Sequence, residues 1–307
     1  MPYFFQLSAM MQIIATGVCS AAWSAFAPHI PLVGIFLAPF FLIPLFLVSF
    51  SQNKGAGALA AFISGCLTFL LSGPLPALAF FIIYFTLFLY LSFLFLQKDE
   101  KGIFRYSLGD ILSKLSSLVL IIISAGLVIL RMQNIDWQVS LEEQMSQIPL
   151  STSDLKSLIH QLITWLPGLL GVSILGTLTL NAYIAQILLE KHQRQVRTRQ
   201  ALDWDSPLYW DIIFIMGLML WLLAEFWQTH SIMVFAKAIL SIACLPLIFI
   251  GFRICYLQLR QQASGKMWFF LLTIVSFLLV WPLVFIVILG LIEPWYGLTQ
   301  YYASKQE

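Results

Sequence analysis

Long stretches of this sequence carry almost no charge, and this constrains the fold more than any other feature. Residues 1–97 contain a single charged side chain, Lys54, and no charged side chain lies from Ser157 to Leu189 or from Met267 to Ile292. A helix needs about 20 apolar residues to cross the hydrocarbon core of a bilayer. These stretches are long enough, so the sequence predicts membrane-spanning helices.

Composition and pattern support this interpretation. The chain is 60% hydrophobic and 10% charged, whereas soluble globular proteins carry about 25% charged residues. A transmembrane β-barrel would show short segments that alternate between polar and apolar residues, and stretches such as FFLIPLFLVSF do not alternate. We therefore expect an all-α fold, a polytopic transmembrane helical bundle with eight or nine spans.

Nine apolar segments are candidate spans, and they divide the chain into three regions. Residues 1–131 form an N-terminal bundle of five spans, 132–162 an extracytoplasmic amphipathic segment, and 163–307 a C-terminal bundle of four spans. The first two spans are either a tight hairpin or one broken helix. The expected spans are 8–27, 31–50, 57–73, 75–97, 112–131, 163–190, 207–227, 232–257 and 267–292.

Basic residues predict the orientation. With nine spans, most of the 16 Lys and Arg residues fall on one side, and Arg131, Lys156 and Lys305 fall on the other. Basic residues concentrate on the cytoplasmic side of a membrane. We expect the protein to lie in the inner membrane of a bacterium, with its N-terminus in the cytoplasm. The N-terminus would lie on the outer side if the first two spans are one re-entrant element.

The longest outer segment, Met132 to Gln161, has its own pattern. Leu155, Leu158 and Ile159 recur at helical spacing towards its end. This favours one or two amphipathic helices at the outer membrane interface that lead into the sixth span. The alternative is a simple connector.

Small residues recur every four positions in the first span, at Gly17, Ala21 and Ala25. Small residues let another helix approach closely. The pattern fits ordinary packing within the bundle, and it equally fits a docking face for a partner membrane subunit.

Polar residues recur with the same spacing in the sixth span, at Ser173, Thr177 and Asn181. One polar face inside a membrane should meet other helices or a cavity rather than lipid. The two interpretations are hydrogen bonds between helices and one wall of a substrate pocket.

Two charged residues lie inside spans. Glu225 is near the end of the seventh span and Lys237 is one to two turns into the eighth. An unpaired charge at such a depth costs about 3 kcal/mol on insertion scales, so we expect the two to pair. The pair is either structural or part of a pocket or ion path.

A basic loop follows the sixth span and contains Lys191, Arg194, Arg197 and Arg199. It is a topology signal that contacts anionic lipid head groups, or a docking patch for a cytoplasmic partner.

No catalytic or metal-binding pattern is visible. The sequence lacks a Walker A loop, H-E-x-x-H and G-x-S-x-G. The four histidines are scattered, and the four cysteines lie in apolar segments without metal-ligand spacing. The net charge of +2 is too small to indicate nucleic acid. We therefore expect no enzyme activity, no cofactor and no metal.

Several segments resemble the YybS-like predicted membrane proteins of bacteria, in their alphaproteobacterial form. The chain departs from the family pattern at Arg197, which is followed by Thr198 where a proline is common. The resemblance rests on PHIPLVGIFLAP (28–39), SGPLPALA (72–79), RYSLGD (105–110), NAYIAQ (181–186) and GLIEPW (290–295).

The resemblance implies a function as well as a fold. The family has no established activity, but its N-terminal region is similar to the substrate-binding S subunits of energy-coupling-factor transporters. Those subunits dock to a transmembrane coupling partner through small residues of the first helix, which would be Gly17, Ala21 and Ala25 here. The implied partners are a transmembrane coupling subunit and ATPases. The small-residue face and the polar stripe together suggest that a small-molecule substrate would lie among spans one, three and six.

The alternative function is a non-enzymatic scaffold or assembly factor without a ligand. It would hold its partners through the basic loop. In both cases membrane lipids surround the protein.

Overall fold

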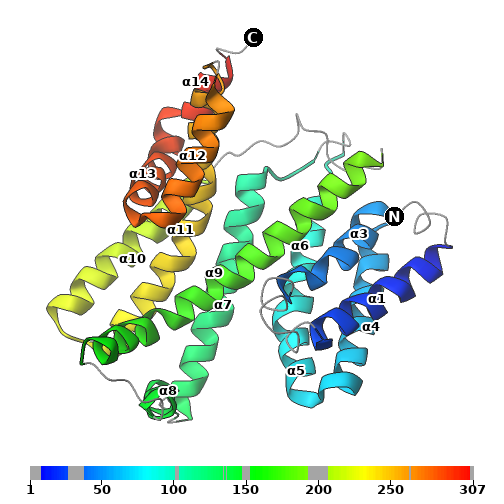
Figure 1. Ribbon diagram of the computed structural model, residues 1–307, viewed down its shortest axis with the longest axis horizontal. Coiled ribbons are helices and arrows are strands. Elements are labelled where there is room, and N and C mark those ends of the chain that lie inside the picture. Colours follow the sequence, from blue (N-terminus) through cyan, green and yellow to red (C-terminus); the bar gives the residue numbers. More distant parts are fainter. Residues whose placement is uncertain are drawn as a thin grey trace. The chain divides into compact units, whose positions relative to one another are not determined.

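A computed structural model of the chain describes residues 8–26, 38–100, 104–133, 135, 137–146, 153–192, 207–262 and 264–304. All regular elements in these ranges are helices (Figure 1), which confirms the predicted all-α class. They are α1 (Ala9–Phe26), η3 (Ala38–Leu42), α3 (Ile43–Ser51), α4 (Lys54–Ser72), α5 (Pro74–Ala79), the π-helix η4 (Phe80–Phe85), α6 (Thr86–Leu96), α7 (Leu108–Met132), α8 (Trp137–Ser146), α9 (Ser153–Lys191), α10 (Leu208–Phe226), α11 (His230–Leu259), α12 (Gly265–Leu278), α13 (Val280–Tyr296) and α14 (Leu298–Ser304).

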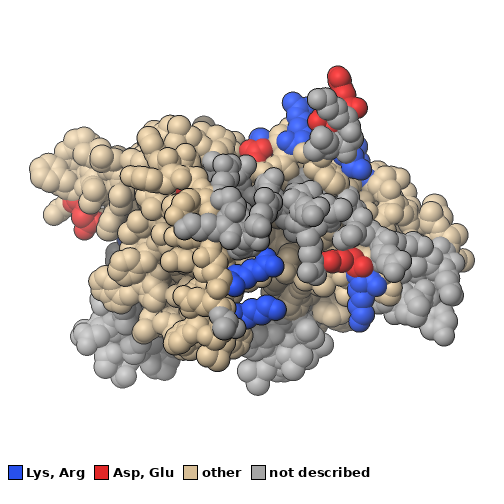
Figure 2. Space-filling model, turned by 90° about the horizontal axis from the view of Figure 1, so that it is seen from above, with Lys and Arg blue, Asp and Glu red and all other residues tan. Residues whose placement is uncertain are grey.

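Seven of the described helices are long and apolar enough to cross a membrane. Their outer surfaces carry exposed apolar side chains such as Leu75 and Phe226, 76% and 82% exposed, which lipid would cover. On the face drawn in Figure 2, the charged side chains of the described residues form small separate groups. The chain is thus a multi-pass membrane protein.

Two of the nine predicted spans differ from the structure. For the segment 31–50, the described apolar helix covers Pro39–Ser51, about 20 Å at 1.5 Å per residue, whereas a membrane core is about 30 Å thick. The segment 267–292 is broken into Gly265–Ser276 and Trp281–Tyr296, bent by 113°. Counted as one broken span, this pair makes eight spans.

The break in the last apolar segment has a local cause. The backbone is extended at Leu279, and Pro282 lies in the first turn of α13. Proline has no N–H to donate and is tolerated in the first turn of a helix but not in its interior. Pro282 therefore favours the start of a new helix, although the hydropathy of the segment 267–292 alone predicts one continuous helix.

The chain folds into two compact units. Unit 1 combines Met1–Ser107 with Leu175–Asp203, and unit 2 combines Leu108–Ile174 with Trp204–Glu307. This differs from the linear division predicted at residues 131 and 162. The reason is that α9 is one long helix, whose first part belongs to unit 2 and whose second part belongs to unit 1.

In unit 1, α1 and α4 run in the same direction and pack closely. Gln52, just before α4, donates from Nε2 to Gln12 Oε1 at 2.7 Å, and Gly17 lies against Ala60 and Ile63 of α4. A Cβ on Gly17 would be 2.8 Å from the Ala60 carbonyl oxygen. Such a close approach of two membrane helices needs small residues.

Aromatic side chains join the η3–α3 segment to the continuous α5–η4–α6 segment of unit 1. The paired positions rise together along both segments, so the two run in the same direction. The ring centroids are 5.0 Å apart for Phe41–Tyr84, 4.8 Å for Phe46–Phe88 and 4.4 Å for Phe50–Phe95.

In unit 2, α11 is the central helix, and α7, α10, α12, α13 and α14 pack against it. Two glycines bring α11 and α13 together. Gly251 of α11 faces the Ile286 backbone, and Gly290 of α13 faces the Leu247 backbone. Because 251 pairs with 286 and 247 with 290, α11 and α13 are antiparallel.

Candidate functional site

Lys237 is a buried lysine on the second turn of α11, 8% exposed. Its ammonium donates a hydrogen bond to Thr164 Oγ1 of α9 at 2.9 Å. The same ammonium lies over the ring of Trp165, 5.2 Å from the ring centroid. Both partners are neutral, and an aromatic face attracts a cation through its quadrupole.

Thr164 is oriented to accept this bond. Its hydroxyl donates its one proton to the Gln161 carbonyl oxygen at 2.7 Å, which leaves the oxygen lone pairs for Lys237. Thr164 is itself 4% exposed. Thr164 is therefore the acceptor in this contact, and Lys237 is the donor.

A close approach of α9 and α11 holds this arrangement in place. Gly168, one turn after Thr164, lies against Ser241 and Ala238 of α11. Ser241 donates its hydroxyl proton to the Lys237 carbonyl oxygen at 2.8 Å. The two helices run parallel here, because 164 meets 237 and 168 meets 241.

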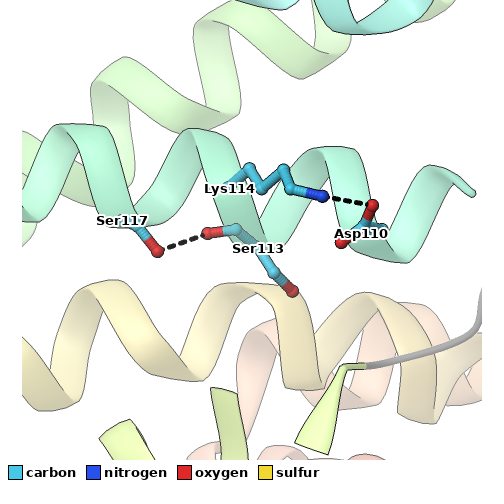
Figure 3. A network of polar contacts seen from close by, with 4 residues as sticks. All are labelled: Asp110, Ser113, Lys114 and Ser117. Carbon is cyan, nitrogen blue, oxygen red and sulfur yellow. Dashed lines mark hydrogen bonds and ion pairs between the residues drawn. The ribbon is translucent and has the colours of Figure 1, made fainter. Parts of the chain in front are cut away.

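The predicted ion pair between Glu225 and Lys237 is not formed. Glu225 is exposed and acts on Lys237 only through space. An ion pair does form between Lys114 and Asp110 at 2.6 Å, within α7 (Figure 3). The reason is rotation: α10 packs on a different face of α11, with Gly217 against Ile239, while Lys237 faces α9.

Further polar contacts gather at the same end of unit 2. Arg131, at the end of α7, donates from Nη1 to Ser231 Oγ at 3.1 Å. His230 Nε2 and Gln138 Oε1 of α8 are 2.7 Å apart. The end of α7, the helix α8 and the start of α11 therefore meet close to the level of Lys237.

Asp211 is a second buried ionisable residue of unit 2. It lies in the first turn of α10 and is 1% exposed, and neither carboxylate oxygen has a hydrogen-bond partner. Its neighbour Trp210 is fully buried and donates from Nε1 to the Ala243 carbonyl oxygen at 3.1 Å. A buried carboxylate without donors is unfavourable.

The predicted polar stripe of α9 does not form one continuous wall. Asn181 is fully buried and donates from Nδ2 to the carbonyl oxygens of Pro39 and Thr177, at 2.7 and 2.5 Å. Thr177 is half-buried and Ser173 is exposed. Asn181 thus binds another segment of unit 1, as the helix-packing interpretation expected, while its Oδ1 has no partner.

The predicted docking face of α1 is largely occupied within unit 1. Gly17 packs against α4, Ala21 is fully buried, and Ala25 is half-buried. This corresponds to ordinary packing within the bundle. It also means that α1 and α4, the first and third predicted spans, lie directly against each other at Gly17.

The basic loop lies mostly outside the described residues. Lys191 ends α9 and is exposed. Arg194, Arg197 and Arg199 fall in the part that the structure does not describe. Within the described residues, no group of three His, Cys, Asp or Glu side chains could hold a metal ion.

Sequence reasoning missed Thr164 as the partner of Lys237. The available signal was Gly168, since a glycine one turn away on a membrane helix favours a close helix contact beside it. Nothing in the sequence indicates which helix makes that contact.

Comparison of the chain with protein-family models, curated proteins and solved structures finds no match. The resemblance to the YybS-like proteins therefore stays a prediction. Function has to be inferred from the geometry of the sites.

Proposed function

We propose that the protein is a non-enzymatic transport subunit of the bacterial cytoplasmic membrane that binds a small molecule in unit 2 and has no ATPase of its own. The observation that carries the proposal is Lys237. It is a buried cation in a membrane-spanning helix, and its ammonium contacts a hydroxyl and an aromatic ring. Ionisable residues in such positions mark substrate and ion pathways.

A purely structural role for Lys237 would require an ion-pair partner, and Glu225 is not that partner. A buried charge is unfavourable unless it is paired and hydrogen-bonded. An exposed carboxylate on another face compensates little of that penalty. A ligand that supplies the missing counter-charge would explain why the cation is kept.

The directions of the helices support the proposed orientation. In unit 2 the Arg131–Ser231 bond joins the end of α7 to the start of α11, so Lys114 and Arg260 lie towards the opposite end. In unit 1, Lys54 lies over the ring of Phe93 near the end of α6. We assign to the cytoplasm the end of unit 2 that carries Lys114 and Arg260, and the end of unit 1 that carries Lys54.

A coupling partner would have to use a surface other than the Gly17 face, because α4 covers that face. The scaffold function is the second candidate. It is favoured by Asn181, whose amide is bound to Pro39 and Thr177 and leaves less of the α9 stripe for a ligand.

Native mass spectrometry of the detergent-extracted protein tests the proposal. We expect a retained small molecule that is lost in Lys237→Met and kept in Lys114→Met, a matched change of a lysine in the same unit. Wild-type protein without any retained small molecule, recovered instead with other proteins, would favour the scaffold.

A further inference from the structure

We infer that Lys237 is the centre of a binding site for an anionic oxygen group, a carboxylate or a phosphate, which enters from the α8 end of unit 2. For a solute the inference rests on the proposed function; for a lipid it does not. The reasoning starts from the unsatisfied charge of the ammonium.

An ammonium has three protons to donate, and Lys237 donates one of them to Thr164 Oγ1. Within the described residues no carboxylate lies at ion-pair distance from it. The Thr164 lone pair and the Trp165 face hold the cation without neutralising it. Charge and donor capacity are therefore left for an additional group.

Arg131 adds a second cation at this end of the unit. Arg131 also donates to a hydroxyl, Ser231 Oγ, and it is exposed. Ser231 lies six residues before Lys237 on α11, a rise of about 9 Å. An exposed arginine at this end of the unit would attract an anion, and the buried lysine about two turns further along α11 would bind it.

The geometry of the Lys237 ammonium indicates the chemical class of the ligand. A lysine ammonium is a compact point charge that binds carboxylate and phosphate oxygens. Two sources fit this chemistry at the outer interface: the head group of an anionic lipid and a soluble anion. An ammonium-bearing ligand does not fit, because like charges repel at such distances.

The test uses full-length protein in an uncharged detergent and follows the melting temperature. In the first arm, sodium phosphate or sodium acetate is compared with sodium chloride at equal ionic strength. In the second arm, phosphatidylglycerol is compared with phosphatidylcholine. We expect wild type to gain several degrees in at least one arm, Lys237→Arg to keep the gain, and Lys237→Met to lose it.

Each variant is compared with its own melting temperature without anion, so a change in folding does not imitate a loss of binding. Lys114→Met is the matched control and should respond like wild type. Arg131→Gln should need a severalfold higher anion concentration for the same gain, because it removes attraction at the entrance and not the central contact.

The outcomes separate the two proposals. A gain with phosphate or acetate that depends on Lys237 supports a solute anion. A gain confined to phosphatidylglycerol supports the anion site but contradicts the solute-binding function. No gain in either arm, or an equal gain in Lys237→Met, overturns the anion site, while a neutral molecule retained in native mass spectrometry would leave the proposed function standing.

Discussion

The ammonium of Lys237 donates to Thr164 Oγ1 at 2.9 Å, and Glu225, the carboxylate nearest to it in sequence among the membrane helices, is exposed and is not at ion-pair distance from it. The sequence predicted that Lys237 forms an ion pair across α10 and α11. In the structure, Lys237 instead forms a hydrogen bond across α9 and α11. The buried cation is therefore left with neutral neighbours. We expect this to lower the stability of the protein, so that variants at Lys237 and at its neighbours should change the free energy of unfolding.

A double-mutant cycle of Glu225→Gln and Lys237→Met measures whether the two charges interact. Because Glu225 is exposed, we expect its change to alter the free energy of unfolding by less than about 0.5 kcal/mol. A buried charge without a counter-charge carries a desolvation penalty of several kcal/mol, and a methionine side chain carries no such penalty. We therefore expect Lys237→Met to be no less stable than wild type. A coupling energy of about 3 kcal/mol between the two residues would instead indicate that they form an ion pair.

Thr164→Val should destabilise the protein, because it removes the acceptor of a buried ammonium. Hydrogen bonds to charged groups contribute about 1.5–3 kcal/mol, and Thr164→Ser should keep most of that. Thr179→Val is the control, since Thr179 bonds only to backbone carbonyls of its own helix. Equal losses for Thr164→Val and Thr179→Val in denaturation from mixed micelles would contradict the contact.

Gly17→Ala should destabilise unit 1, because the new methyl group would press on the Ala60 carbonyl oxygen. Overpacking of this kind costs about 1–3 kcal/mol. Gly126→Ala is the matched control, since a Cβ there meets nothing within 4 Å, and it should be neutral or slightly stabilising. If Gly17→Ala kept full thermal stability and lost a co-purifying membrane partner instead, the α1 face would be a docking surface after all.

Asn181→Leu and Ser173→Leu distinguish packing from ligand binding on α9. We expect Asn181→Leu to lower the melting temperature, because it removes the hydrogen bond to Pro39, and Ser173→Leu to change it little, because Ser173 is exposed. Two stable variants that both lose a retained ligand would favour the predicted pocket wall.

The sequence by itself predicted the all-helical class of this protein and the bounds of several of its apolar helices. The expected segments 75–97 and 207–227 correspond to Pro74–Leu96 and Leu208–Phe226. These bounds are local properties: an uninterrupted apolar run must satisfy its backbone groups within its own helix in a membrane. Pro282 was also a local signal for the break at Leu279, but the prediction followed the continuous hydropathy of the segment and missed the break.

Only the tertiary structure decided which residues meet. Spacing placed Gly17 and Ala21 on one face and Ser173, Thr177 and Asn181 on another, but it could not tell what lies opposite each face. That depends on the rotation of each helix about its axis and on which helices are neighbours, and neither is encoded in the hydropathy of a single segment. For this reason the sequence could locate Lys237 inside a span, whereas the fold alone chose Thr164 over Glu225 as its partner.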